Sequence, residues 1–346
     1  MTEEDLSKRL QRYLAQRIPG AAISGFQFLT NGFESEVFSF NLHLPTEVTQ
    51  PMILRLYPGQ GAEQKMTREA KGLIRLRQDS YPVPAMLLYE NGISSLGHPF
   101  SILQKLEGRS LWPVLAEAEP DRAEQLLSRF GNLIAHLHRL DWRAYTERTE
   151  LYEAHPELLL KELWSPLRQL YLQFEVKGCL AILDWLVGQR SRIRLQPAVV
   201  HLDLHANNVF LLDDEPEEPR ERMAVIDWTQ IAVCDYRVDL SWTLMIMGDY
   251  GSPAWAESIR GAYQVAAGHP LEDLDYFFVF AYTKLLGSTV ISLKADPKEV
   301  GLRPETAASP QEQSPTLLRL SRRIRELTGL RLPEVDAVLS QAGLGE

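Results

Sequence analysis

The chain has 346 residues, of which 45% are hydrophobic, and it carries a formal net charge of −10. This length predicts two lobes or domains, and the negative charge argues against a nucleic-acid partner, since such proteins gather Lys and Arg against phosphates. The charged start, MTEEDLSKRL, is unlike a signal peptide and no apolar run approaches the ~20 residues of a membrane span, so we expect a soluble cytoplasmic protein without a membrane partner.

The first hundred residues show a helical pattern, a series of strands and a second helical pattern. Apolar residues at helical spacing predict helices at 4–18 and 63–77. Short apolar runs predict strands at 26–29, 36–44, 52–57 and 98–106, and Asn31-Gly32 favours a turn between the first two. An antiparallel sheet is therefore expected near the start of the chain.

Arg55 lies between two leucines in the third predicted strand. Successive side chains of a strand point to opposite faces, so Arg55 must face away from Leu54 and Leu56. A charged side chain in that position requires either a polar partner or solvent. Arg55 is therefore a candidate binding residue, with an exposed arginine on an edge strand as the alternative.

Beyond Ser110 the sequence predicts mainly helices. Asp239 is expected to cap one of them, and one of His136 and His138 is expected to be a buried core histidine rather than a metal ligand. The proline-containing segment 296–315 is expected to be a loop, and Gly329 to end the helix before it. The helices are expected at 122–141, 158–187 (two helices), 271–293, 317–327 and 332–344.

The main group of candidate site residues lies between His201 and Trp228. His201, Asp203 and Asn208 occupy a short loop before an apolar run at 209–212, and Asp227 follows a second apolar run at 223–226. The acidic segment 213–221 between these runs is expected to be the solvated tip of a hairpin. Such a hairpin would support three side chains that carry oxygen atoms.

This set of side chains is typical of phosphoryl transfer, in which the protein mainly positions groups and neutralises charge. Mg²⁺ prefers oxygen ligands and takes one or two carboxylates together with nucleotide phosphates, and Asn208 and Asp227 fit that description. Asp203 would then face an incoming hydroxyl and accept or orient its proton, while His201 would brace the loop. A surface loop with capping Asp and Asn side chains is the alternative.

The segment resembles the catalytic and metal-binding loops of the aminoglycoside phosphotransferase and choline kinase superfamily. There the loop reads H-x-D-x-x-x-x-N, and an aromatic residue follows the metal aspartate, as Trp228 follows Asp227. The resemblance spans about residues 26–293. It implies an α+β, protein-kinase-like, two-lobed fold, with a β-rich N-terminal lobe at 1–103, a hinge at 104–110 and a helical C-terminal lobe at 111–346.

The resemblance also implies a nucleotide site. Arg55 stands where the family usually has the Lys that binds the α- and β-phosphates, and Glu69, or else Glu63, would pair with it. Asp239 would hold the catalytic loop by accepting its backbone N–H groups. The other expected nucleotide contacts are Ser35 on the first hairpin and the backbones of Gln104 and Leu106 at the hinge.

The implied reaction moves the γ-phosphoryl group of ATP or GTP, with Mg²⁺, to a hydroxyl of a small molecule. The net charge is compatible with a cationic acceptor, but relatives accept aminoglycosides, choline, homoserine, macrolides and sugars. The chain departs from the family at Arg55, and at Leu202 and Asn207, where Gly is frequent. A non-catalytic nucleotide-binding module is the main alternative, and adenylyl transfer is another.

Overall fold

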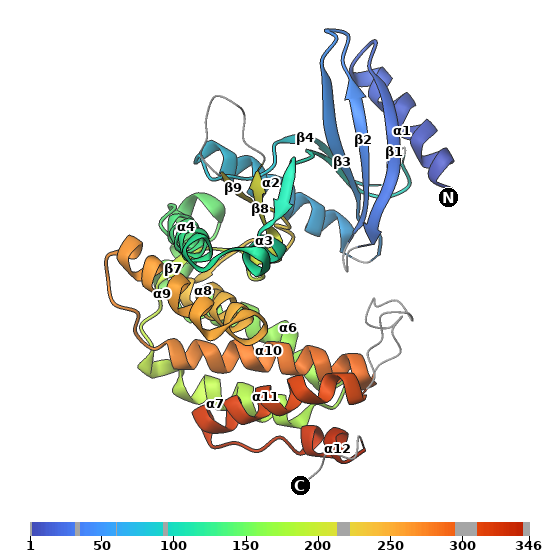
Figure 1. Cartoon of the computed structure of the whole chain (residues 1–346). Coiled ribbons are helices and arrows are strands. Elements are labelled where there is room, and N and C mark those ends of the chain that lie inside the picture. Colours follow the sequence, from blue (N-terminus) through green and yellow to red (C-terminus); the bar gives the residue numbers. More distant parts are fainter. Residues whose placement is uncertain are drawn as a thin grey trace. The chain divides into compact units, whose positions relative to one another are not determined.

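The computed structural model describes residues 2–31, 35–59, 61–92, 96–212, 222–294 and 310–341. The chain forms two compact units (Figure 1). Unit 1 comprises residues 1–123 and 204–231, and unit 2 comprises residues 124–203 and 232–346. The predicted division at residues 103 and 111 remains a prediction, and the hairpin that it assigned to the C-terminal lobe belongs to unit 1.

Unit 1 contains a five-stranded antiparallel sheet with the strand order β1-β2-β3-β5-β4. The helices and strands predicted before residue 107 are confirmed with small shifts of their ends, whereas β4 was not predicted. The strands are β1 (Ala22–Asn31), β2 (Glu36–His43), β3 (Thr49–Leu56), β4 (Met86–Glu90) and β5 (Phe100–Gln104), and the helices are α1 (Glu3–Arg17) and α2 (Ala62–Gln78).

The alternation of β3 places one face of the sheet in the core and leaves the other for a pocket. Met52, Leu54 and Leu56 are buried, and they share a hydrophobic cluster with Leu10 of α1. Ile53 and Arg55 are only half-buried, because they point to the opposite face. The apolar core on one side thus orients Arg55 toward the other side.

A second, three-stranded sheet of unit 1 carries the predicted hairpin. Its strands are β6 (Gly108–Ser110), β8 (Val209–Leu212) and β9 (Met223–Val225), in the order β6-β8-β9, and all neighbours are antiparallel. The short helices α3 (Leu111–Glu117) and η3 (Ala206–Asn208) flank the strands in sequence. The predicted acidic tip at 213–221 lies outside the described residues.

Unit 2 is mainly helical, with a two-stranded antiparallel sheet of β7 (Pro197–Val200) and β10 (Ala232–Asp235). Its described helices include α9, which the sequence analysis did not predict. Their bounds are α4 (Pro120–His138), which begins in unit 1, η1 (Trp142–Tyr145), α5 (Thr149–Ala154), α6 (Leu158–Gln173), α7 (Lys177–Gln189), η2 (Arg190–Arg192), α8 (Tyr236–Ile246), η4 (Met247–Gly251), α9 (Pro253–Ala267), α10 (Leu274–Lys294), α11 (Pro310–Thr328) and α12 (Pro333–Gln341).

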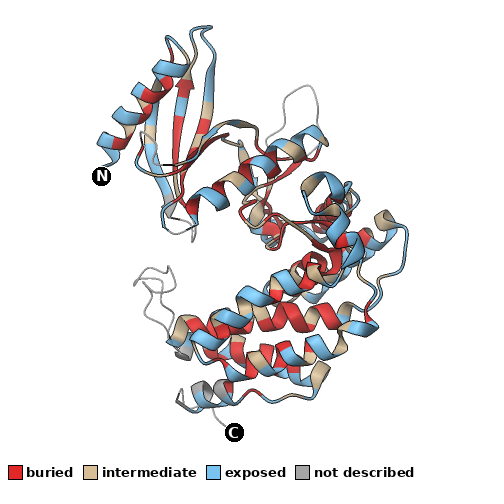
Figure 2. Ribbon diagram, turned by 180° about the vertical axis from the view of Figure 1, so that it is seen from behind, coloured by how far each residue is buried: buried red, intermediate tan, exposed pale blue. Residues whose placement is uncertain are grey.

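Helix α10 is the core helix of unit 2. It packs against α7, α8 and α11, and most of its residues are buried (Figure 2). By length and composition α10 could cross a membrane, but 67% of its most apolar window is buried inside the protein. Its apolar character is therefore accounted for by packing against the surrounding helices.

Two expectations for unit 2 are wrong. Asp239 does not cap α8: Asp235 occupies that position and accepts the Arg237 N–H, so that Asp239 lies one turn inside the helix. Of the predicted loop 296–315, residues 296–309 lie outside the described residues, and residues 310–315 form the start of α11 instead. Pro310 takes the first helical position, where a missing N–H is tolerated. Gly329 follows α11 with a φ of 75° and donates its N–H to Arg325 O, as predicted.

Close packing inside unit 2 yields a stability prediction. A Cβ atom on Gly287 of α10 would lie 2.5 Å from Cζ of Tyr171, a fully buried side chain whose hydroxyl donates to Thr283 O. Gly287→Ala should therefore lower the free energy of unfolding by about 1–3 kcal/mol. Urea denaturation followed by circular dichroism measures this change.

Gly261→Ala is the matched control, since Gly261 is an exposed glycine of α9 with no atom within 4 Å of its added Cβ. This variant should raise the free energy of unfolding by about 0.4–1 kcal/mol, because alanine restricts the unfolded chain. Equal unfolding midpoints for the two variants would contradict the packing described for α10.

Candidate active site

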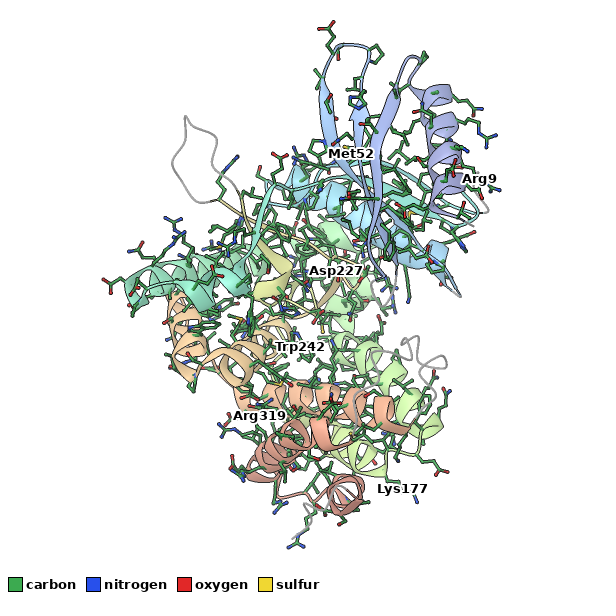
Figure 3. All side chains as sticks on the ribbon, turned by 45° about the vertical axis from the view of Figure 1, so that its right-hand side comes forward. Arg9, Met52, Lys177, Asp227, Trp242 and Arg319 are labelled. Carbon is green, nitrogen blue, oxygen red and sulfur yellow. The ribbon has the colours of Figure 1, made fainter. Side chains whose placement is uncertain are left out.

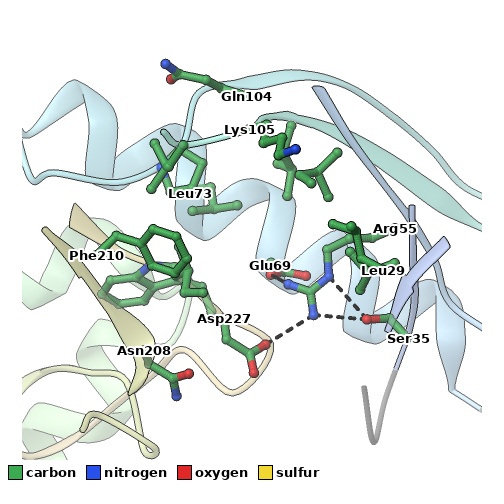
Figure 4. Close-up of a pocket in the computed structure, with 17 residues that line it drawn as sticks. Leu29, Ser35, Arg55, Glu69, Leu73, Gln104, Lys105, Asn208, Phe210 and Asp227 are labelled. Carbon is green, nitrogen blue, oxygen red and sulfur yellow. Dashed lines mark hydrogen bonds and ion pairs between the residues drawn. The ribbon is translucent and has the colours of Figure 1, made fainter. Parts of the chain in front are cut away.

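A pocket of about 390 Å³ lies within unit 1, on the face of the five-stranded sheet to which Arg55 points (Figure 4). Most of its wall is apolar. Seven polar residues line it as well: Ser35, Arg55, Glu69, Gln104, Lys105, Asn208 and Asp227. The apolar lining residues are Leu29, Val37, Ile53, Leu73, Pro84, Leu103, Leu106, Phe210, Ile226 and Trp228. A pocket of this composition suits a ligand with a flat apolar part and an anionic part.

Arg55 links three parts of unit 1 by ion pairs and hydrogen bonds. Its Nη1 lies 2.5 Å from Glu69 Oε1, and its Nη2 lies 3.1 Å from Asp227 Oδ1. Nε and Nη2 also donate to Ser35 Oγ at 3.2 and 3.0 Å. The guanidinium therefore joins β3 to α2, to the residue before β2 and to the segment after β9.

The Arg55–Glu69 pair is an enclosed charge pair, since the two side chains are 12% and 1% exposed. Burial by itself lowers the pKa of Arg55, but the Glu69 carboxylate, with Tyr57 and Asp227, more than offsets this and raises it. The guanidinium is therefore always charged. The pairing with Glu69 is the one that the resemblance implied, and Glu63 is not the partner observed.

Tyr57 completes the surroundings of Glu69. Its hydroxyl donates to Glu69 Oε2 and lies 3.2 Å from Ser101 Oγ. Burial, followed by the charge of Glu69, raises the pKa of Tyr57 well above its ordinary value, so the hydroxyl stays protonated. Tyr57 and Ser101 were not predicted as site residues. The i, i+2 spacing of Arg55 and Tyr57 was the available signal, but Leu56 and Tyr57 end an apolar run and looked like ordinary core residues.

Asn208 and Asp227 are brought together by the hairpin of unit 1. Ile226 donates its N–H to Asn208 O at 2.9 Å, which fixes the segment after β9 beside the residue before β8. Asp227, labelled in Figures 3 and 4, has a φ of 64°, a left-handed conformation that Asp tolerates better than most residues. Both side chains line the pocket and offer oxygen atoms, so the donor set fits a hard cation such as Mg²⁺.

The predicted hinge residues Gln104 and Leu106 also line this pocket. Gln104 uses its backbone N–H for Ala85 O at 2.8 Å, and its side-chain Oε1 accepts the Ala85 N–H. The Gln104 N–H is therefore taken by β-sheet bonding, and a base contact by Gln104 would have to use another atom. The expected pairing of the hinge with a nucleobase stays a prediction.

His201 and Asp203 belong to unit 2, where Asp239 holds their loop. The Asp239 carboxylate is fully buried and accepts the N–H groups of His201 at 2.8 Å and Leu202 at 2.7 Å, as the resemblance implied. His138 is the buried histidine: its Nε2 lies 3.4 Å from Asp239 Oδ2. A helix-borne carboxylate thus fixes the backbone just before Asp203.

The side chains of His201 and Asp203 have separate environments. His201 is fully buried, and its Nδ1 accepts the Asp203 N–H at 3.3 Å, consistent with a bracing role. Asp203 is half-buried, and its Oδ1 accepts a hydrogen bond from Trp242 Nε1 at 3.0 Å. Trp242 was not predicted as a site residue, because it is 39 positions away in sequence and carries no motif.

The model of a family described as "Phosphotransferase enzyme family" matches residues 26–274. A search of curated protein sequences found no match.

Solved structures with the same fold include several phosphotransferases. A protein of Ralstonia eutropha JMP134, assigned as a candidate aminoglycoside phosphotransferase, is 18% identical with a TM-score of 0.60, and 98% of each chain is covered. The macrolide 2'-phosphotransferase type I is 16% identical with a TM-score of 0.62, covering 95% of this chain and 97% of that one. The GDP complex of aminoglycoside 2'-phosphotransferase-IIIa is 14% identical with a TM-score of 0.55, covering 97% and 99%. The predicted α+β, protein-kinase-like, two-lobed fold is thus confirmed.

The environment of Asp239 yields a pH-dependent prediction. Burial opposes its charge, but the hydrogen bond and charge of His138 and the contacts with His201 hold the pKa of Asp239 below its ordinary value of 3.8. A carboxylate with a lowered pKa stabilises the fold above pH ~4, and this stabilisation is lost as the pH falls through the folded-state pKa. Asp239→Asn should therefore lower the free energy of unfolding by about 2 kcal/mol at neutral pH.

The measurement is urea denaturation of wild type and Asp239→Asn between pH 7 and pH 3. The difference between the two proteins should stay constant down to pH ~5 and shrink below pH ~4, where the wild-type carboxylate becomes protonated. A difference that is the same at both ends of the range would show that the charge of Asp239 does not support the loop.

Proposed function

The chain belongs to the phosphotransferase enzyme family, and from this premise we propose that it transfers the γ-phosphoryl group of ATP or GTP to a hydroxyl group of a small molecule. The observation that carries the proposal is the pocket of unit 1, in which the charged Arg55–Glu69 pair, Asn208 and Asp227 share one cavity with apolar walls. We further propose that the enzyme works in the cytoplasm and that its lobes divide at the hinge 104–110.

In this proposal the nucleotide occupies the pocket of unit 1. The apolar walls would enclose the base, which is flat and weakly solvated, while the Arg55 guanidinium would bind phosphate oxygens. Glu69 and Ser35 hold the guanidinium toward the pocket by the bonds described above, so the phosphate-binding group is oriented before the ligand arrives. Pre-orientation of this kind lowers the entropy cost of binding.

Asn208 and Asp227 would hold Mg²⁺. When bound, the cation would supply positive charge that offsets the negative charge of the phosphates. The hairpin contributes by fixing the two ligands: the Ile226 N–H bond to Asn208 O ties one to the other. Asp227 is 44% exposed, so its carboxylate is accessible from the pocket.

Asp203 would orient the acceptor hydroxyl and accept its proton. It is half-buried, and the indole N–H of Trp242 donates to one oxygen of the carboxylate, which limits the rotation of the side chain. His201 and Asp239 would hold the backbone beneath it.

The acceptor is the small molecule whose hydroxyl group receives the phosphoryl group. The similar structures are described as acting on aminoglycosides, macrolides or ethanolamine, and the net charge of −10 is compatible with a cationic acceptor. The test incubates the protein with Mg²⁺ and γ-labelled ATP or GTP and a panel containing kanamycin, gentamicin, a macrolide, ethanolamine, choline and homoserine. Transfer of label to one member supports the proposal, and product mass distinguishes phosphoryl from adenylyl transfer.

A protein that binds both nucleotides but neither hydrolyses them nor labels any acceptor would be a non-catalytic nucleotide-binding module. A protein that binds neither nucleotide in the presence of Mg²⁺ would refute both readings. Calorimetry of nucleotide binding is therefore run beside the transfer assay.

Asp203→Ala should abolish most transfer while leaving nucleotide binding intact, because the residue acts on the acceptor and not on the phosphates. We expect kcat to fall at least about a hundredfold, as is typical for the loss of a general base. The dissociation constant for Mg-nucleotide, measured by calorimetry, should stay within a factor of two of wild type by the same reasoning. An unimpaired kcat would exclude the assigned role.

Asp227→Ala should instead remove the dependence of nucleotide affinity on Mg²⁺, because one of two proposed ligands is lost. The measurement is calorimetric titration with nucleotide, with and without Mg²⁺. Asp184→Ala serves as control, since Asp184 is a 61% exposed carboxylate of unit 2 paired with Arg168. An Asp227→Ala protein that retains the Mg²⁺ effect of wild type would refute the proposed ligand.

A further inference from the structure

Leu202, the residue before Asp203, has a strained backbone. Its φ of 67° lies in the left-handed region, which costs a residue with a Cβ atom about 1–2 kcal/mol. Glycine adopts this conformation freely, whereas leucine does so only at this cost. A strained conformation persists only where the surrounding structure holds it from several sides. The side chains that bind the backbone of Leu202 therefore determine the conformation just before Asp203.

Two charged side chains hold the two peptide groups that flank Leu202. The Leu202 N–H, in the peptide group before the residue, donates to Asp239 Oδ1 at 2.7 Å. The Leu202 carbonyl, in the peptide group after it, accepts from Lys284 Nζ at 2.8 Å. The first contact restricts φ and the second restricts ψ, so the direction in which the next side chain, Asp203, leaves the backbone is fixed by both.

Lys284 also contacts the residue that binds the Asp203 carboxylate. Its Nζ lies 4.4 Å from the centroid of the Trp242 ring, within the range of a cation–π interaction. Trp242, on α8 and labelled in Figure 3, donates its indole N–H to Asp203 Oδ1. Lys284 therefore touches both supports of Asp203, the backbone before it and the ring beside it.

The setting of Lys284 makes this contact specific. The residue comes from α10, the core helix of unit 2, where its neighbours Thr283 and Leu286 are fully buried. Lys284 is half-buried and donates to one particular carbonyl, so its side chain loses conformational freedom and solvation. A lysine whose only role is solubility is exposed and does not bear these costs. Helix α10 packs against α8, so Lys284 and Trp242 are carried by two helices in contact.

We propose that Lys284 and Trp242 are positioning residues for Asp203: Lys284 fixes the backbone of Leu202 and the face of the indole ring, and the indole N–H fixes the rotation of the carboxylate. The proposal rests on the proposed function, in which Asp203 orients the acceptor hydroxyl. Neither residue needs to touch the nucleotide.

The test uses Lys284→Met, Lys284→Arg and Trp242→Phe, each assayed for hydrolysis of Mg-ATP and Mg-GTP with water as the acceptor. Lys284→Met and Trp242→Phe should lower kcat about ten- to a hundredfold, the range expected when a reacting group is displaced by up to an ångström. The nucleotide KM should stay within about twofold, and Lys284→Arg should recover part of the loss because it retains a charged donor.

Lys294→Met is the matched control. Lys294 is also on α10 and also donates to a backbone carbonyl, that of Glu175, but it is exposed and lies away from the loop in sequence and contacts. Its kcat should equal that of wild type. If Lys294→Met lost as much activity as Lys284→Met, the effect would belong to the helix in general and the proposal would be overturned.

A second arm tests whether the two residues act through Asp203. In an Asp203→Ala background, Lys284→Met and Trp242→Phe should cause no further fall in the residual hydrolysis, because the group that they position is absent. Additive losses in that background would overturn the proposal.

Hydrogen exchange gives a readout that does not depend on turnover. The amides of residues 201–203 should exchange faster in Lys284→Met than in wild type or Lys294→Met, since the carbonyl anchor of Leu202 is lost. A wild-type protein without any nucleotide turnover would count against the proposed function, and the exchange result would then decide the bracing by itself. Unchanged exchange in Lys284→Met would overturn the bracing in either case.

Discussion

The guanidinium of Arg55 is the point at which unit 1 is tied together. A guanidinium has five N–H groups in a rigid planar fork. Arg55 uses them for Glu69 of α2, for Ser35 before β2 and for Asp227 after β9, which is 172 residues away in sequence. A lysine ammonium is a compact point charge and could not span these three partners in one plane. The neighbouring residues are arranged around this arginine, and the Tyr57 hydroxyl completes the arrangement by donating to the other oxygen of Glu69 while it lies within hydrogen-bond distance of Ser101 Oγ.

The elements that the sequence predicted well are those with local signals. The alternation around Arg55 in β3 and the 3.6-residue periods of α1, α2 and α10 are visible in short windows, and the structure contains them within a few residues of the expected ends. The loop with His201, Asp203 and Asn208 was recognisable because these residues stand at the fixed offsets of the motif H-x-D-x-x-x-x-N, and Asp227 because it follows the next apolar run. The Arg55–Glu69 ion pair was expected only from the resemblance, since the residues around Arg55 and around Glu69 do not predict that the two side chains meet.

The parts that could not be predicted depend on contacts distant in sequence. Asp235 and Asp239 are four residues apart, and by sequence either could cap the helix. Contacts distant in sequence decide between them, because Asp239 is bound by His201, Leu202 and His138 and therefore lies inside the helix. His138 is 101 residues away from Asp239. By sequence, Trp242 and Lys284 are ordinary helix residues. In the fold they contact Asp203 and Leu202, which are 39 and 82 positions away. No periodicity or motif predicts such contacts. They follow from which helices share the core of unit 2.

The ion pair between Arg55 and Asp227 affects the electrostatics of the pocket. Each anionic side chain there already has the same cation as neighbour, because Arg55 lies between Glu69 and Asp227. A divalent ion that approaches alone meets a carboxylate whose field is partly cancelled, and it is repelled by the guanidinium at close range. In the proposed function, a phosphate chain would reverse this balance, because its negative charge would attract both the guanidinium and the ion. In the proposed function, the ion and the phosphate chain would therefore bind more favourably as one neutralised complex than one after the other.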